Sequence, residues 1–491
     1  MQFSSRSQTL QITTNANGKS TFNEIINDGN VIEYYSYVNG VLHVYDLMLN
    51  EKTHFSLGRG RDTRLLEVSK SSNHYLFVLF NSSNSLEFEI RNESGTKMGD
   101  WSLTDLTTLQ EMQIGEIAKG GEIDYNLVYP LAGQGFIVQF PSRKSVYGMD
   151  VKLLDFNAKV LWSWSTENTS GSHYFGDILS VSPQYVLLSI CKKNNALGNK
   201  MELLLKVIDV QNGSEIFSRE MISKDSELLN VQSGFVENKD QTSTITIFGE
   251  YYEDGKDPVR DKSEGLFIES FSAQGEELSF RKLDWDIELK ETTASTRNAS
   301  LCVHRAVRDE NGDLVVIGEQ FRKSVNLGTA IANLAFDDQE SVLEIQIHDL
   351  VVFKFSSTGE LLQQQTIQNP VRHITWNDGS AIQSSVLLMR RLKRSGYFAY
   401  RFSTLDVQKH VVRVVYSLTY DPDYRRKNHA DIIIGVVECG SDGIQSFKVP
   451  LKSEVNMFGL YCAKSGSIAV AEYSPKFDLL QLKLVDLVPN R

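Results

Sequence analysis

Two stretches of the sequence, IFGEYY at Ile247–Tyr252 and VIGEQF at Val316–Phe321, are near copies of one another and decide the fold. A longer match follows them, between Leu266–Leu278 and Leu350–Leu362. Both longer segments contain an apolar run, then Phe-Ser, then Gly-Glu, then a second apolar run. Self-similarity of this kind is the signature of a repeat architecture, so we expect the chain to repeat one structural unit.

Each copy predicts a β-hairpin, because its two apolar runs are rich in the β-branched and aromatic residues that favour strands. The Gly-Glu pairs begin with Gly275 and Gly359, and glycine supplies the positive φ that a short hairpin turn requires. Six weaker copies, in which an apolar strand ends on a polar residue before a turn, lie around Asp46, Arg91–Gly95, Asp155, Asp209–Gly213, Glu438–Gly443 and Asp486. Two strong and six weak copies make eight units.

Each unit has room for four strands. Upstream of most copies lies a further hairpin, as at Asn73–Phe80, Gln184–Cys191, Asp313–Ile317 and Gly396–Arg401. Four-stranded units that repeat around a ring are typical of β-propeller blades, whose radial packing leaves only short, protected edges. We therefore predict an all-β chain in which residues 1–491 form a single β-propeller domain of about eight four-stranded blades.

Two alternatives to this architecture stay open. Phe22–Leu57 and Arg64–Leu103 are the least regular units, so a ring of seven blades is the nearest alternative. The other is an all-β fold of a different type, since any such fold contains many strand-turn-strand segments. Helical patterning is nearly absent, which disfavours an α/β enzyme fold.

The two ends of the chain predict how the ring closes. The last unit, Val455–Leu487, stops after its third strand, while Thr9–Thr14 is a strand that belongs to no unit. We predict that Thr9–Thr14 supplies the missing outer strand of the last blade. This pairing removes an open sheet edge, which would otherwise favour aggregation.

In its architecture the sequence resembles the β-propeller superfamily over essentially its whole length. The resemblance implies a fold but no particular active site, because the motifs of individual propeller families do not recur. Asp284-Trp285 has no partner copies of the WD kind, Gly120-Gly121 is a lone pair rather than a kelch series, and no Asp box is found.

The composition excludes several classes of partner. The 491 residues carry a formal net charge of −12, whereas nucleic-acid binding relies on an excess of Lys and Arg. No apolar run approaches the roughly 20 residues needed to cross a bilayer, and Met1–Thr14 is too polar for an export signal. The cysteines form no CxxC pair, so they predict buried strand residues rather than a zinc cluster or a disulfide framework. They are Cys191, Cys302, Cys439 and Cys462.

Three long loops on neighbouring units mark the expected binding face. They are Tyr252–Gly265, Arg322–Glu344 and Thr404–Ala430, each expected between the second and third strands of its unit. Short loops are the structural default, so three long neighbours predict a shared surface. Tolerated insertion without a function is the alternative interpretation.

These loops combine basic and aromatic residues, which suit the anchoring of a partner or stacking on sugar rings. The candidate binding residues are Tyr252, Arg260, Phe321, Arg322, Lys323, Tyr420, Tyr424, Arg425 and Arg426. Solvated loop charge is the alternative interpretation. Thr329–Phe336 predicts a short helix capped by Thr329, and a second basic run, Arg390–Arg394, is expected at a turn or blade edge.

No catalytic or metal-binding motif is recognisable. Asp309–Asp313 resembles a calcium loop, but its glycine comes too early and the bidentate Glu is missing, so the segment predicts a hairpin turn. His304 and His348 fall in predicted strands, where a structural imidazole is the usual finding. We therefore expect no metal, no cofactor and no catalytic residue, although acids gathered from several blades around the channel would escape a motif search.

The leading hypothesis is a non-catalytic binding or scaffolding propeller that holds a protein partner on the face of the three long loops. The alternative is a carbohydrate-binding or carbohydrate-active propeller, a hydrolase or lyase in the latter case, whose loop tyrosines stack on sugar rings. Whether the chain is an enzyme stays open, with a binding role favoured. We expect an extracytoplasmic location, periplasmic or at the cell surface, with a cytoplasmic location as the alternative.

Overall fold

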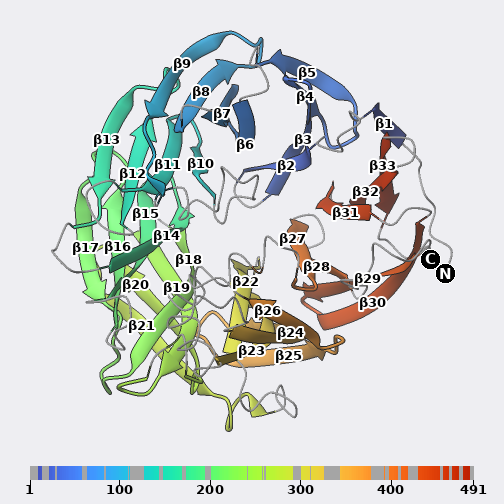
Figure 1. Ribbon diagram of the computed structural model, residues 1–491. Helices are drawn as coiled ribbons and strands as arrows, with labels where there is room; N and C mark the ends of the chain where they lie inside the picture. The colour runs from blue at the N-terminus through green and yellow to red at the C-terminus, as the bar shows by residue number, and fades with distance from the viewer. Residues whose placement is uncertain are drawn as a thin grey trace, which may run out of the picture.

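In the computed structural model, the strands form eight radial sheets arranged as a ring, which is the architecture of an eight-bladed β-propeller (Figure 1). Seven sheets have four strands and one has five. The structure describes residues 9–13, 21–27, 30–57, 63–81, 84–108, 110, 126–142, 148–167, 173–193, 201–239, 242–256, 258, 261–290, 300–309, 311–325, 343–376, 392, 397–406, 411–417, 430–453, 457–463, 467–474 and 479–486.

Within each blade the strands are antiparallel, and the first lies nearest the centre of the ring (Figure 1). The first four blades are β2 (Thr21–Asn27), β3 (Asn30–Val38), β4 (Val41–Tyr45) and β5 (Glu51–Ser56); β6 (Thr63–Ser71), β7 (His74–Asn81), β8 (Ser85–Asn92) and β9 (Lys97–Leu103); β10 (Val128–Leu131), β11 (Gly135–Pro141), β12 (Met149–Leu154) and β13 (Val160–Ser165); and β14 (His173–Val181), β15 (Tyr185–Lys193), β16 (Met201–Asp209) and β17 (Glu215–Glu220).

The remaining blades follow the same order, with one addition. The next three are β18 (Leu228–Lys239), β19 (Thr242–Tyr252), β20 (Gly265–Ser272) and β21 (Glu277–Asp284); β22 (Ser300–Arg308), β23 (Leu314–Val325), β24 (Leu343–Phe355) and β25 (Leu361–Ile367); and β27 (Tyr400–Asp406), β28 (Val411–Ser417), β29 (Ala430–Gly440) and β30 (Gly443–Ser453). In the sixth blade β26 (Arg372–Trp376) pairs with β24 as a fifth strand. The eighth blade consists of β31 (Met457–Cys462), β32 (Ser467–Ser474), β33 (Leu479–Asp486) and β1 (Thr9–Thr13).

The eighth blade confirms the predicted ring closure. β1 lies antiparallel to β33, with Thr9 opposite Lys483 and Thr13 opposite Leu479. Strand β1 is therefore the outer strand of the last blade, and Figure 1 shows it beside β33. Of the predicted strand Thr9–Thr14, the last residue lies outside the described residues.

The blade count and the two uncertain units also agree with the sequence. The unit predicted at Phe22–Leu57 is the blade β2–β5, and the unit predicted at Arg64–Leu103 is the blade β6–β9. Eight sheets are present, so the seven-bladed alternative is wrong. The all-β class is confirmed.

Middle strands are apolar because they are buried on both faces. Successive side chains of a strand point to opposite faces of its sheet, and each blade packs between two neighbours. Every residue of β11 is buried, whereas the outer strand β9 has only half-buried and exposed residues. The middle strands consequently read as continuous apolar runs in the sequence.

A separate apolar cluster fills each of the eight joints between neighbouring blades. At the closing joint, the small side chains of Ala469 and Ala471 from the eighth blade share a cluster with the buried rings of Tyr34 and Tyr45 from the first. Each buried large side chain contributes about 1.5–3 kcal/mol. Since a blade contacts only its two neighbours, stability is distributed over these joints.

The first of the two near-identical stretches fastens one blade to the next. Glu250 of β19 is only 1% exposed, and its Oε1 accepts a hydrogen bond from the backbone N–H of Leu301 in the sixth blade, at 2.9 Å. A Cβ on the preceding Gly249 would lie 2.0 Å from the carbonyl oxygen of Asn230. Glycine is therefore needed at position 249, where two strands of the blade approach closely.

The second copy does the same at the following joint. Glu319 of β23 accepts hydrogen bonds from the backbone N–H groups of Ala399 and Tyr400 in the seventh blade, each at 2.8 Å. Its Oε2 also lies 3.1 Å from Nε2 of His304 on β22. The Gly-Glu pair in the repeat thus has a mechanical role: its carboxylate holds the innermost strand of the next blade.

Turns and cysteines follow the sequence predictions. Gly275 and Gly359 have φ values of +89° and +83° in their hairpin turns, as predicted. Asp309–Asp313 is the predicted hairpin turn between β22 and β23, closed by a hydrogen bond from the Asp309 N–H to the Asp313 carbonyl at 2.8 Å. His304 and His348 lie in strands β22 and β24. All four cysteines are buried and free, and each lies in a strand.

Candidate functional site

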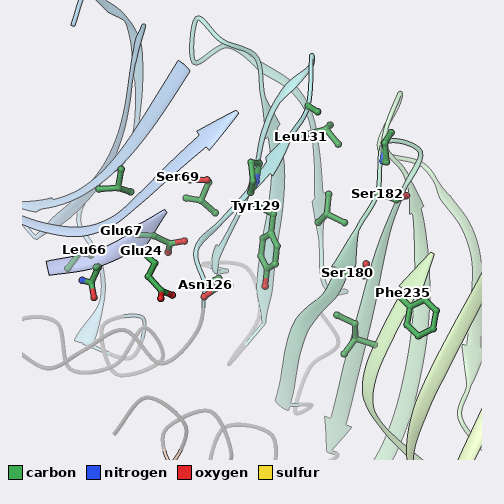
Figure 2. Close-up of a pocket in the computed structure, with 18 of the residues that line it drawn as sticks. Glu24, Leu66, Glu67, Ser69, Asn126, Tyr129, Leu131, Ser180, Ser182 and Phe235 are labelled. Atoms are coloured by element: carbon green, nitrogen blue, oxygen red, sulfur yellow. The ribbon is translucent and has the colours of Figure 1, made fainter. Parts of the chain in front are cut away.

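A cavity of about 770 Å³ lies among the innermost strands of the ring (Figure 2). Its walls come from β2, β6, β10, β14, β18 and β31 with the residues that flank them, and from Tyr35 of β3. These strands belong to the first five blades and to the eighth. Small-molecule sites typically occupy about 300–1,000 Å³, so this central cavity has the size of a ligand site.

Glu24 is the first of two carboxylates in the wall of the central cavity. Its Oε1 accepts a hydrogen bond of 2.5 Å from the backbone N–H of Cys462, on β31 of the eighth blade. Burial raises the pKa of Glu24 to about 7, because the charged carboxylate loses water, and the Cys462 N–H offsets this only in part. A carboxyl group with a strongly raised pKa inside a cavity is a physical indicator of a functional site.

Glu67 is the second carboxylate, on β6 of the second blade. Its Oε2 accepts a hydrogen bond of 2.8 Å from the backbone N–H of Leu127, next to β10 of the third blade. Glu24 and Glu67 therefore each link two blades while they also line the cavity. Figure 2 shows both carboxyl groups on the side of the cavity formed by the first two blades.

Two further polar side chains in this wall have hydrogen-bonding capacity to spare. Ser69 lies two residues after Glu67 on β6, is 4% exposed and lines the cavity. Asn23 donates from Nδ2 to the hydroxyl of Tyr35 at 3.3 Å, which leaves its Oδ1 as an acceptor. A hydroxyl can donate and accept, so Ser69 can form hydrogen bonds with a ligand in the cavity.

Aromatic rings complete the wall. Tyr129 on β10, Phe235 on β18 and Tyr461 on β31 are half-buried and line the cavity. The hydroxyl of Tyr129 donates to the carbonyl oxygen of Ile178 at 3.3 Å, which holds this ring in place. Figure 2 shows Tyr129 between the two carboxylates and Phe235. Flat rings beside polar groups suit a ligand with one apolar face and several polar substituents.

The charged side chains described in the wall are acidic. Among the described residues that line the cavity, Glu24 and Glu67 are the charged ones, and none is Lys, Arg or His. An anionic ligand would meet repulsion without compensation, whereas a neutral hydrogen-bond donor or a cation would not. The wall therefore selects against phosphate and carboxylate ligands.

His304 and Glu319 form a second buried polar group, but it has no access. The His304 ring stacks on Tyr400 with centroids 4.5 Å apart and meets Phe398 edge-on at 4.8 Å. The side chain of His304 is 1% exposed and that of Glu319 is fully buried. This group holds the sixth and seventh blades together and offers no surface to a substrate.

Two of the aromatic residues expected on the binding loops are buried in the core, which corrects the sequence interpretation. Tyr252 ends β19 and is 1% exposed, and its hydroxyl donates to Oε2 of Glu250 at 3.1 Å. Phe321 lies within β23, is 2% exposed and packs in an apolar cluster with Ile345 and Phe398. Alternation along each strand turns these two rings inward, so neither offers a face to a partner.

Most of the basic candidates lie outside the described residues, and one of the expected loops contains a strand. Arg322 is exposed, as expected, but it lies in β23 opposite Gln346 rather than in a loop. Thr404–Ala430 is not one loop, because β28 lies within it. Lys323 is in β23 with its side chain outside the described residues. Entirely outside them lie Arg260, Tyr420, Tyr424, Arg425, Arg426, Thr329–Phe336, Arg390, Arg391, Lys393 and Arg394.

The central cavity escaped the sequence analysis because each blade contributes only one or two polar residues to it. Asn23 and Glu24 stand on one strand and Glu67 and Ser69 on another, with no shared local motif. The available signal was weak: polar residues interrupt the apolar pattern in the first strand of a unit. In the described part of the chain, no group of three or more His, Cys, Asp or Glu side chains could hold a metal ion.

A comparison with models of protein families identifies the family of this chain. Residues 35–488 match the model of a family described as a family of unknown function, DUF6770. The chain belongs to DUF6770. The match includes strands of all eight blades and leaves out β1, β2 and the start of β3, so the propeller described above is the architecture of this DUF6770 member. No curated protein matches it.

Solved structures similar to this DUF6770 chain include enzymes and a WD40 domain. A europium-containing methanol dehydrogenase is 8% identical with a TM-score of 0.48, over 98% of this chain and 94% of that one. Prolyl oligopeptidase B from Galerina marginata is 9% identical with a TM-score of 0.42, over 93% of this chain and 55% of that one. The WD40 domain of SCAP from fission yeast is 9% identical with a TM-score of 0.27, over 99% and 98%.

These likenesses concern the fold and carry no argument about activity. The chain spans about half the length of the prolyl oligopeptidase, 55% of it. Within the described residues, no helix is long and apolar enough to span a membrane.

Proposed function

We propose that this chain is a binding propeller that holds a carbohydrate in its central cavity. One observation carries the proposal: the wall combines carboxylate, amide and hydroxyl groups with three half-buried aromatic rings, and its described residues include no cation. Sugars present hydroxyl donors at their edges and apolar C–H faces, which match acceptors and rings respectively. The size of the cavity, about 770 Å³, suits a short oligosaccharide segment.

The hydrogen bonds that the two carboxylates accept favour a binding role over hydrolysis. Glu24 and Glu67 each accept a hydrogen bond from the backbone of another blade. A glycosidase needs a pair of carboxyl groups free to exchange protons with the substrate and with water. Here one oxygen of each group accepts a backbone hydrogen bond from another blade, which fixes the group as an acceptor, so we assign both to binding.

The protein partner expected on the three long loops stays a prediction. Of its nine candidate residues, five lie wholly outside the described residues, Lys323 has its side chain outside them and two are buried, which leaves Arg322 as the exposed one with a described side chain. The described lining of the cavity comes from six blades, so the carbohydrate proposal has the stronger basis.

The test is a glycan array probed with the wild-type chain, followed by titration calorimetry on each glycan that is retained. Asn23→Ala removes an exposed amide whose described contact is one weak hydrogen bond, so the fold should persist. We expect it to weaken sugar binding about tenfold, the value of one hydrogen bond of about 1.4 kcal/mol.

The matched control is Asn311→Ala, which removes an exposed amide on the β22–β23 turn, away from the cavity. It should bind as the wild type does. Retention of no glycan by the wild type, or equal losses in the two variants, would overturn the proposal.

A further inference from the structure

The wall of the central cavity carries an acid whose charge has no described partner. Glu24 accepts one hydrogen bond, from the backbone N–H of Cys462, and pairs with no Lys, Arg or His among the described residues. Its titratable neighbours are the phenols of Tyr34 and Tyr400 and the thiol of Cys462, each of which is neutral near pH 7. Burial of a carboxylate without a cation is unfavourable, so a cationic ligand would stabilise the ionised form.

Acceptors beside Glu24 match the geometry of an ammonium group. A protonated amine has three N–H donors and no acceptor. Asn23, which precedes Glu24 on β2 and whose Oδ1 is an acceptor, and Ser69, which is 4% exposed, both line the same cavity. Glu67 adds a second negative charge on that side of the cavity (Figure 2). Neutral acceptors in the same cavity as an uncompensated acid are groups with which a donor-only cation can form hydrogen bonds.

We propose that the sugar bound in the central cavity is an amino sugar, and that its protonated amine is held by Glu24 with Asn23 and Ser69 as further acceptors. This inference rests on the proposed function. It names the substituent by which the cavity distinguishes one carbohydrate from another. The ring of the sugar would lie against the aromatic side of the cavity, where Tyr129 and Phe235 stand.

Three β-1,4-linked tetrasaccharides separate the contributions, because they share one backbone and differ at a single position of each sugar. The glucosamine tetramer carries ammonium groups, the N-acetylglucosamine tetramer carries neutral amides, and the glucose tetramer carries hydroxyls. Titration calorimetry at about pH 6 keeps the amines protonated. We expect the glucosamine tetramer to bind at least tenfold more tightly than either neutral tetramer, by virtue of one charge-assisted contact.

Substitution identifies the residue responsible. Glu24→Gln keeps the shape and the acceptor for Cys462 but removes the charge, so it should lower the affinity for the glucosamine tetramer about tenfold and leave the neutral tetramers unchanged. Glu360→Gln is the matched control, since Glu360 is exposed on the β24–β25 turn and away from the cavity. Ser69→Ala provides a second variant whose small change keeps the test informative if Glu24→Gln fails to fold.

Proton release distinguishes the two possible roles of Glu24. A carboxyl group that binds the amine releases its proton when the ligand binds, whereas a purely structural carboxyl group does not. In the empty cavity at about pH 6, Glu24 is mostly protonated because its pKa is raised to about 7. Binding of the ammonium should expel that proton, so titrations in two buffers of different ionisation enthalpy should show release of about one proton. The neutral tetramers, and the Glu24→Gln variant, should release none.

The outcomes distinguish the two proposals. Binding of the neutral tetramers as tightly as the glucosamine tetramer, or no proton release, would overturn the amine assignment while the carbohydrate proposal stands. Failure of all three tetramers and of the glycan array would overturn the carbohydrate proposal itself.

Discussion

Glu250→Ala should loosen the joint between the fifth and sixth blades. The carboxylate of Glu250 accepts four hydrogen bonds: from Ser263 Oγ at 2.7 Å, Gln232 Nε2 at 2.8 Å, the Leu301 N–H at 2.9 Å and the Tyr252 hydroxyl at 3.1 Å. Alanine leaves all four donors without this acceptor. A buried donor that loses its acceptor costs about 1–3 kcal/mol, and the lower figure applied to four donors gives about 4 kcal/mol.

Two measurements test this value. Urea unfolding should report a loss of about 4 kcal/mol, a large part of the stability of a typical domain. Hydrogen exchange followed by mass spectrometry should show the Leu301 amide exchanging up to about a thousandfold faster, since each 1.4 kcal/mol is a factor of ten. The matched control is Glu277→Ala on the outer strand β21 of the same blade, where the carboxylate is exposed and pairs with Lys224 at 3.1 Å.

The control should change stability by no more than about 0.5 kcal/mol, as surface substitutions usually do. Equal losses for the two variants, or a Glu250→Ala variant with an unchanged Leu301 amide, would refute the idea that this carboxylate holds two blades together.

The other predictions concern a glycine, an acid and the thiols. Gly318→Ala should lower the melting temperature by several degrees, because its Cβ would lie 2.8 Å from the Leu301 side chain and 2.9 Å from the Cys302 carbonyl; an unchanged melting temperature would refute this. Stability of the wild type should fall as pH rises from about 4.5 to about 7, because burial raises the pKa of Glu24 to about 7 and the folded state retains a proton that the unfolded chain releases. Melting curves of Glu24→Gln should lack this component, and identical pH profiles would contradict it. A thiol-reactive dye should label none of the four cysteines until the chain is unfolded, since all are buried and burial raises the pKa of Cys439 to about 12; rapid native labelling would contradict their placement.

Much of the fold could be read from the sequence because its physical causes are local and repeated. A hairpin needs apolar strands and a residue of positive φ. Gly275 and Gly359 have positive φ and can be recognised in the sequence as turn residues. Ring closure could be predicted because an unpaired strand at one end of the chain matched a missing strand at the other. The role of Glu250 in the repeat was not apparent, since its partner, Leu301, lies in a different blade.

The site was harder to predict, for two physical reasons. Tyr252 and Phe321 were assigned to the binding face because they stand at the start of two long loops, but both still belong to strands whose alternation turns them inward. The cavity residues Glu24 and Ser69 come from different blades, and nothing in a single strand distinguishes the side facing the cavity from the side facing a neighbour. Only the closed ring brings them together.

The pairing of Thr9 with Lys483 has a consequence for biosynthesis. Strand β1 is made before the seven blades that separate it from β33, so it stays without its sheet until the eighth blade has been synthesised. Contacts between residues so distant in sequence form slowly, so closure should be a late step in folding. A chain that stalls or is cut before the last blade would expose both the waiting strand and one face of the first blade, which are features that chaperones and proteases recognise. Closure of the ring therefore acts as a check that all eight blades have been made.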